Sequence, residues 1–180
     1  IMTVTSGHGD FRQTTELPRT LGAPLTTQER LGAAMIVDSP DEMRARVREQ
    51  LMQGASQIKL TAGGGVASPH SPLDVSTFTE PELRAAVEAA ENWGTYVAAH
   101  AYTPVSIQRS IAAGVRCIEH GHLMDDATAR LMAEKGIWLS ATVPRCIGRK
   151  WYGARGAGQD AAGRYRHRDG LRLGKEIPDQ

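Results

Sequence analysis

The sequence predicts an α/β fold built around a parallel sheet. From residue 39 onward, short apolar runs alternate four times with amphipathic helical segments, which is the pattern of strands joined by crossover helices. Each helical segment begins at a capping residue and ends at a glycine. The apolar runs are continuous, as expected for strands that are covered on both faces. Strands connected in this way pair in parallel through right-handed crossovers.

The expected elements follow one another along the chain. A short strand at 2–6 ends at Gly7-His8-Gly9-Asp10, and weak periodicity then predicts a long loop to about Val37. Two helices begin with capping boxes, at Ser39-Pro40-Asp41-Glu42 and Thr79-Glu80-Pro81-Glu82. The four units are a helix at 39–54 with a strand at 56–61, a helix at 79–94 with a strand at 95–101, a helix at 103–114 with a strand at 115–119, and a helix at 125–136 with a strand at 137–143.

The bulk composition is that of an ordinary globular domain. The 180 residues carry a formal net charge of +1, which gives no argument for binding nucleic acid or a membrane. No run approaches the roughly 18 apolar residues of a membrane span, and two cysteines do not make a disulfide framework. We therefore expect a cytoplasmic protein, with a catalytic domain at 1–144 and a basic, glycine-rich loop or mobile tail at 145–180.

One lysine lies within an apolar, strand-like run. Lys59 is flanked by Ile58 and Leu60, and the run continues into three glycines; an ammonium group there is costly unless it is paired, coordinated or chemically changed. His100 and His120 end two later strands. Because ligands gather at the carboxyl ends of parallel strands and neutral imidazole is a common zinc ligand, the pattern predicts one metal site that includes Lys59, His100 and His120.

Several alternatives stay open from the residues alone. A single histidine is more often structural than a ligand, and His122 competes with His120. Strand alternation should direct Glu119 to the opposite side from its histidine neighbour, where a salt bridge or helix contact is its expected role. Lys59 could instead form a Schiff base with a carbonyl substrate. Neither a phosphate-binding loop nor a Gly-x-Ser-x-Gly elbow is present.

Four segments resemble the amidohydrolase superfamily, in its branch of imidazolonepropionase-like and Xaa-Pro-dipeptidase-like hydrolases. They are Gly7-His-Gly-Asp-Phe-Arg12, Ile58-Lys-Leu-Thr-Ala-Gly-Gly-Gly-Val66, Ala98-Ala-His-Ala-Tyr102 and Ile118-Glu-His-Gly121. The resemblance implies a (β/α)8 TIM-type barrel, of which this chain supplies roughly strands three to seven. It also implies two divalent metal ions, usually zinc. Lys59 maps onto the bridging ligand, carbamylated by CO2, and His100 and His120 map onto the histidine ligands that end strands five and six.

The sequence also departs from the family pattern. It has no His-x-His pair on an early strand, since His120-Gly-His122 has the spacing but lies too late in the chain. No strand ends in the family's proton-shuttle aspartate, so no catalytic residue is assigned. The rest of the barrel is therefore expected from other sequence or from another chain, and this chain alone is expected to be inactive. Whether it forms a homo-oligomer is left open.

The resemblance implies hydrolysis of an amide or peptide bond by a hydroxide that bridges the metals. Xaa-Pro dipeptides and N-acyl amino acids are the favoured small-molecule substrates. Tyr102, His8 and Arg12 are the candidate substrate-binding residues, because arginine suits a substrate carboxylate and Tyr102 lies two residues beyond His100. The alternatives are hydrolysis of a carbamate, urea or cyclic amide, and a non-catalytic barrel fragment that acts as a scaffold.

Overall fold

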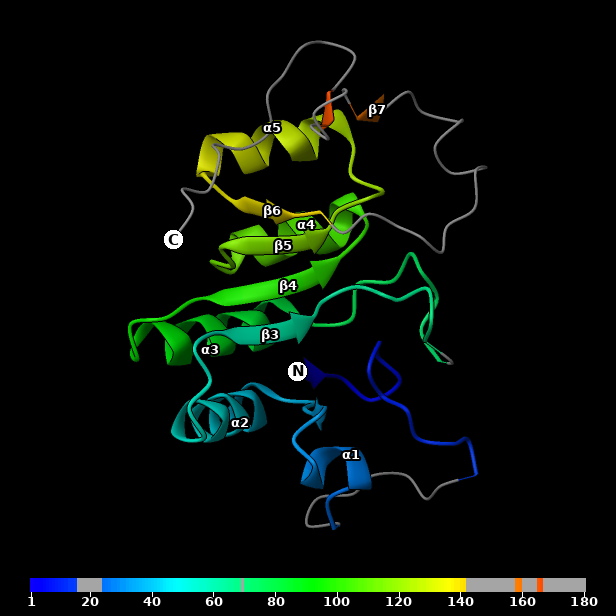
Figure 1. Cartoon of the computed structure of the whole chain (residues 1–180), viewed down its shortest axis with the longest axis vertical. Helices are drawn as coiled ribbons and strands as arrows, with labels where there is room; N and C mark the ends of the chain where they lie inside the picture. The colour runs from blue at the N-terminus through cyan, green and yellow to red at the C-terminus, as the bar shows by residue number, and fades with distance from the viewer. Residues whose placement is uncertain (16–23, 69, 142–157, 160–164, 167–180) are drawn as a thin grey trace.

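The computed structural model describes residues 1–15, 24–68, 70–141, 158–159 and 165–166. These residues include one parallel sheet and the helices packed on it, shown in Figure 1. The strand order is β2-β1-β3-β4-β5-β6, and every neighbouring pair is parallel. The strands are β1 (Met2–Thr3), β2 (Met35–Ile36), β3 (Ile58–Thr61), β4 (Val97–Ala101), β5 (Cys117–His120) and β6 (Trp138–Ser140). The predicted α/β class is confirmed.

The four predicted crossover helices are present, and a shorter helix precedes them. The helices are α1 (Thr27–Arg30), α2 (Pro40–Met52), α3 (Glu80–Glu91), α4 (Pro104–Ala112) and α5 (Asp126–Lys135). Side-chain oxygens cap the N-termini of α5 and α2. Asp125 accepts from the Thr128 amide at 2.8 Å, and Ser39 accepts from the Glu42 amide at 3.2 Å. Glu42 bonds the Asp38 amide rather than that of Ser39. Helix α5 ends at Gly136, whose φ of 65° is one that glycine adopts without steric cost.

The prediction of a long loop up to Val37 is wrong for the second half of that segment. This part of the chain forms α1 and β2, and the buried carboxylate of Glu29 links the two elements. It accepts from the Thr26 amide at 2.8 Å, which closes a capping box, and from the Ile36 amide at 3.3 Å. The Thr-x-x-Glu signature at 26–29 was available in the sequence. It was missed because a four-residue helix and a two-residue strand show no periodicity.

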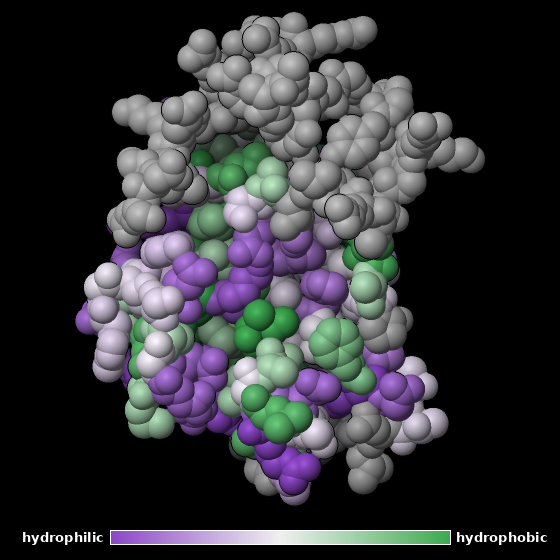
Figure 2. All heavy atoms as spheres, in the orientation of Figure 1, coloured by the Kyte–Doolittle hydropathy of each residue, from purple (hydrophilic) through white to green (hydrophobic). Residues whose placement is uncertain are grey.

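The two faces of the sheet differ in chemistry. The core face carries Ile58, Leu60, Val97 and Ile118, which pack with the buried sides of the helices. Figure 1 shows α3 and α4 behind the strands. The other face, here called the inner face, is not uniformly apolar; Figure 2, in the same orientation, shows hydrophilic and hydrophobic residues side by side. The expectation of strands covered on both faces therefore fails toward β6, where Trp138 is 49% exposed.

The last segment of the chain is described only in part. Strands β7 (Gly158–Gln159) and β8 (Tyr165–Arg166) form a separate antiparallel pair. The expected boundary at residue 144, and most of the expected tail, lie outside the described residues. Within the described ranges, no helix is long and apolar enough to cross a membrane.

The core face should dominate stability. Leu60 is fully buried, so Leu60→Ala is expected to lower the free energy of unfolding by about 2–4 kcal/mol. Leu31→Ala is the matched control, because Leu31 is 75% exposed and its truncation leaves no cavity. Urea unfolding followed by circular dichroism measures both changes. Equal effects of the two substitutions would contradict the assignment of the core face.

Candidate metal and substrate site

The register of three strands decides which side chains share the inner face. Thr61 pairs with His100, and His100 pairs with Glu119. Paired residues of parallel strands point to the same side of the sheet, and alternation places Lys59 on that side too. Glu119 therefore lies on the same face as Lys59, and the two side chains form an ion pair. The prediction that Glu119 points away from the site is wrong, because Glu119 rather than His120 lies opposite His100.

His120 reaches the site by a turn of the backbone. Its strand partner is Ala101, which is buried in the core, so regular alternation would direct the histidine away from the inner face. Its φ is 75°, a left-handed conformation that is uncommon outside glycine. The imidazole consequently lies with its centroid 4.6 Å from that of His100. The end of β5 is thus shaped to bring the two rings together.

Five rings gather at the ends of β4 and β5. His8, from the loop after β1, stacks on His100 with centroids 4.5 Å apart and planes 27° apart. Tyr102 meets His100 edge-on at 4.9 Å and stacks on His120 at 5.3 Å. His122 lies at the margin, 6.0 Å from His120 and 5.8 Å from Tyr102. Four residues singled out from sequence, His8, His100, His120 and Tyr102, are therefore neighbours.

The two central histidines are neutral at physiological pH. Burial lowers the pKa of His100 to about 3, against a smaller opposing effect of its hydrogen bond to Gly64. Burial, followed by the charge of Lys59, lowers the pKa of His120 to about 4. The Nε2 atom of His100 lies 2.7 Å from the carbonyl oxygen of Gly64. Since a carbonyl only accepts, that nitrogen carries the proton and leaves the Nδ1 lone pair available to a metal ion.

Lys59 combines partial burial with an ion pair to Glu119. Its side chain is 22% exposed, and burial lowers the pKa of its amine to about 8, with Cys117 acting in the opposite direction. Burial lowers the pKa of both His8 and His120, and the charge of Lys59 lowers it further.

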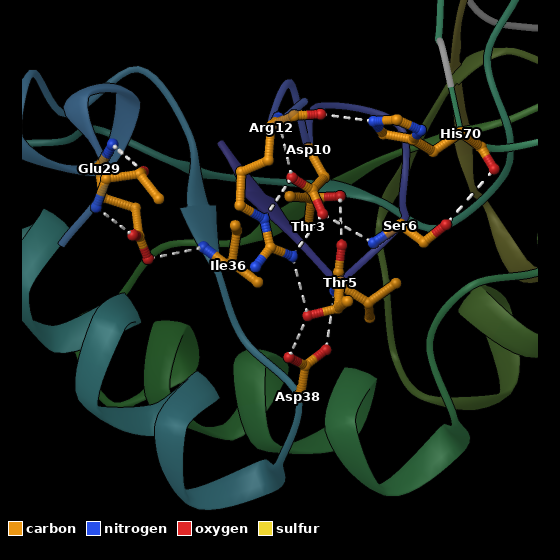
Figure 3. A network of polar contacts seen from close by, with 11 residues as sticks. Thr3, Thr5, Ser6, Asp10, Arg12, Glu29, Ile36, Asp38 and His70 are labelled. Atoms are coloured by element: carbon orange, nitrogen blue, oxygen red, sulfur yellow. Dashed lines mark hydrogen bonds and ion pairs between the residues drawn. The ribbon is translucent and has the colours of Figure 1, made fainter. Parts of the chain in front are cut away.

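Arg12 is engaged by a carboxylate of the chain itself. Its Nε and Nη2 atoms donate to the two oxygens of Asp10 at 2.8 and 2.6 Å, and Nη2 also donates to the Thr5 hydroxyl at 3.2 Å (Figure 3). Asp10 accepts a further bond from the Ser6 amide at 2.8 Å and is almost fully buried. A substrate carboxylate would have to share the guanidinium group with Asp10. Sequence reasoning missed Asp10, although it stands two residues before Arg12 in the quoted motif.

The donor atoms fit part of a metal centre. Within the described residues, no group of three or more His, Cys, Asp or Glu side chains is arranged to hold a metal ion. Two adjacent neutral imidazoles, those of His100 and His120, are nevertheless the ligand type that zinc prefers. Lys59 would add oxygen donors only after its amine had become a carbamate. The described residues thus offer imidazole nitrogens of the type that such a centre uses, without a group of three donors.

Comparison with known proteins identifies the family of this fold and site. The profile of the Amidohydrolase family matches residues 4–158. The chain belongs to the amidohydrolase family. Ochratoxinase of Aspergillus niger is 37% identical over 111 residues, which cover 62% of this amidohydrolase chain and 23% of the ochratoxinase. An uncharacterized protein of Mycobacterium tuberculosis is 33% identical over 154 residues, or 83% of this chain and 40% of that protein.

Solved structures place the same fold in larger proteins. A prolidase in complex with N-methylphosphonate-L-proline is 46% identical, with a TM-score of 0.70 over 77% of this chain and 33% of that chain. The structure of A. niger ochratoxinase is 32% identical, with a TM-score of 0.66 over the same share of each chain. This amidohydrolase chain therefore spans about a third of the length of the structures it matches.

The pairing of Asp10 with Arg12 should be measurable as pH-dependent stability. Burial raises the pKa of Asp10, but the bonds from Arg12 and Ser6 outweigh it and leave the pKa below its ordinary value. The ionised carboxylate of Asp10 therefore stabilises the fold above about pH 4, and this stabilisation is lost as the pH falls through the lowered pKa. We expect Asp10→Asn to reduce the free energy of unfolding at pH 7 by about 1–3 kcal/mol, and the difference from the wild type to shrink in acid.

Asp41→Asn is the control for this measurement, because the Asp41 side chain is 96% exposed where it pairs with Arg44. It should leave unfolding nearly unchanged at every pH. A pH-independent gap between Asp10→Asn and the wild type would show that the ionised carboxylate is not what stabilises the loop.

Proposed function

We propose that this chain carries the central part of a metal-dependent hydrolase site that cleaves an amide or peptide bond. The observation that carries the proposal is that Lys59 and His100 share one face of the sheet and that the His120 ring lies beside His100. These residues lie toward the strand ends, where ligands bind in parallel α/β folds. The favoured substrates are Xaa-Pro dipeptides and N-acyl amino acids. Membership of the amidohydrolase family supports the hydrolase chemistry, and the prolidase relative supports the choice of dipeptide.

The proposed ligands are His100 through Nδ1, His120, and a carbamate formed on Lys59 from CO2. Two divalent metal ions, zinc being the favoured metal, would activate water and polarise the scissile carbonyl. The chain's own contribution is to hold the ligands. The Gly64 carbonyl fixes the ring of His100 through Nε2, and the left-handed turn at His120 places the second ring beside it. Glu119 holds Lys59 on the inner face while the amine is unmodified.

The substrate would lie against the rings that flank the ligands. We propose that Tyr102, whose ring packs against both His100 and His120, donates a hydrogen bond from its hydroxyl to a substrate carboxylate or to the scissile group. His8 borders the same site through its stack on His100. Arg12 is proposed as a weaker partner, because it is shared with Asp10. In a protein that supplies the rest of the barrel, a panel of dipeptides, N-acyl amino acids, carbamates, ureas and cyclic amides separates the substrate classes.

Zinc binding to this chain tests the ligand assignment without requiring turnover. We expect isothermal titration calorimetry to show that His100→Ala and His120→Ala each weaken zinc binding by at least about 10-fold, because each removes an imidazole donor. His70→Ala is the matched control, since Nε2 of His70 bonds the Arg12 carbonyl outside the ring cluster. Equal affinity in all four proteins would reject these ligands, and no zinc binding in any of them would favour the scaffold alternative.

Modification of Lys59 is tested separately. We expect a carbamate signal in the 13C NMR spectrum of the wild type incubated with zinc and 13C-labelled bicarbonate, because bound zinc would stabilise the negative charge of the carbamate. The signal should vanish in Lys59→Ala and persist in Lys135→Ala, where an exposed lysine of α5 is lost. Labelling of Lys59 by borohydride with a carbonyl substrate, and no carbamate signal, would instead support the Schiff base.

A further inference from the structure

Gly65, the last glycine after β3, lies directly against the ring of His8. A Cβ atom placed on Gly65 would overlap this imidazole, meeting Nδ1 first and then Cε1 and Cγ. The two residues are far apart in the sequence and come from loops that follow different strands. The absence of a side chain at Gly65 is therefore what makes room for His8.

Both sides of this contact are held in place by hydrogen bonds. The preceding residue, Gly64, accepts from Nε2 of His100 at 2.7 Å, and its amide donates to the Val75 carbonyl at 3.1 Å. On the opposite side, the loop that carries His8 is closed by the bond from the Asp10 amide to the Gly7 carbonyl at 3.0 Å. His8 is thus confined between the backbone at Gly65 and the ring of His100.

The contact also decides which nitrogen of His8 a ligand could reach. Nδ1 is buried and has no hydrogen-bond partner among the described residues. The atoms that face Gly65 are Nδ1 and its two ring neighbours, so the edge formed by Nε2 and Cδ2 faces away from the glycine. A buried nitrogen without a partner costs stability, so the position of this ring is not explained by stability alone.

We propose that Gly65 is the positioning residue for His8. Because Gly65 has no side chain, the imidazole of His8 packs between its backbone and the ring of His100, with Nδ1 buried. Nε2 is then the nitrogen that a ligand at the ends of β4 and β5 would contact. A substrate carboxylate or carbonyl is the ligand chemistry that an Nε2 proton would recognise. The inference rests on the proposed function only for the identity of that ligand, because the effect of Gly65 on the position of the His8 ring can be tested in the absence of metal and turnover.

The test is the position of the His8 ring in NMR spectra of the full chain. His8 signals, assigned by their loss in His8→Ala, should show the ring-current shift of a ring stacked on His100. In Gly65→Ala we expect this shift to be lost, because the added methyl group displaces the ring. Gly63→Ala is the matched control: its Cβ would meet Ala101 Cα at 3.3 Å and Ser106 Oγ at 3.4 Å, not His8, so the His8 signals should keep their wild-type positions. Unchanged His8 signals in Gly65→Ala would overturn the proposal.

A thermal unfolding series covers the case in which Gly65→Ala does not fold well enough for NMR. We expect Gly65→Ala to lower Tm by roughly 4–8 °C through overpacking. Adding His8→Ala to it should restore at least half of that loss, because the methyl group then occupies the space of the ring. A double variant no more stable than Gly65→Ala would show that the glycine serves something other than His8. Neither outcome depends on zinc binding. A failure of the proposal that Gly65 positions His8 can therefore be distinguished from a failure of the hydrolase proposal.

Discussion

The register between β3, β4 and β5 is the constraint on which the site depends. The core face of these strands carries Ile58, Leu60 and Val97, and their burial against the helices fixes the side of the sheet to which every neighbour points. A slip of one residue would carry Lys59 into the core and expose apolar side chains. The polar inner face is thus a consequence of hydrophobic packing on the other face. Lys59, His100 and Glu119 therefore share the inner face by register alone.

Two departures from regular strand geometry then adapt that face to chemistry. His120 would point into the core if β5 continued regularly, and the left-handed residue at its end turns the ring toward His100. After β3, the carbonyl of Gly64 accepts a hydrogen bond from His100. Gly65 has no side chain, which leaves room for the ring of His8. Strained or permissive backbone often lies at functional sites. Here it lies at the ends of the strands whose side chains form the ring cluster.

Much of the fold could be predicted from the sequence, because capping residues and glycines mark the crossover helices on both sides. The candidate ligands could be found as well, since a lysine within an apolar run and two histidines at strand ends are local signals. Glu119 was misplaced because alternation was counted from His120, whose positive φ breaks the count. The partner of Arg12 and the stack of His8 on His100 depend on tertiary contacts, which spacing alone does not encode.

The bonds around His70 join two loops that are almost sixty residues apart. Its ring nitrogen contacts the carbonyl of Arg12 at 2.6 Å, and its own carbonyl accepts from the Ser6 hydroxyl at 3.4 Å (Figure 3). The loop after β1 is therefore joined to His70 by two contacts. For protein engineering this means that the two segments should be exchanged between relatives as a pair, since a graft of either one alone would lose the backbone contacts that the other supplies.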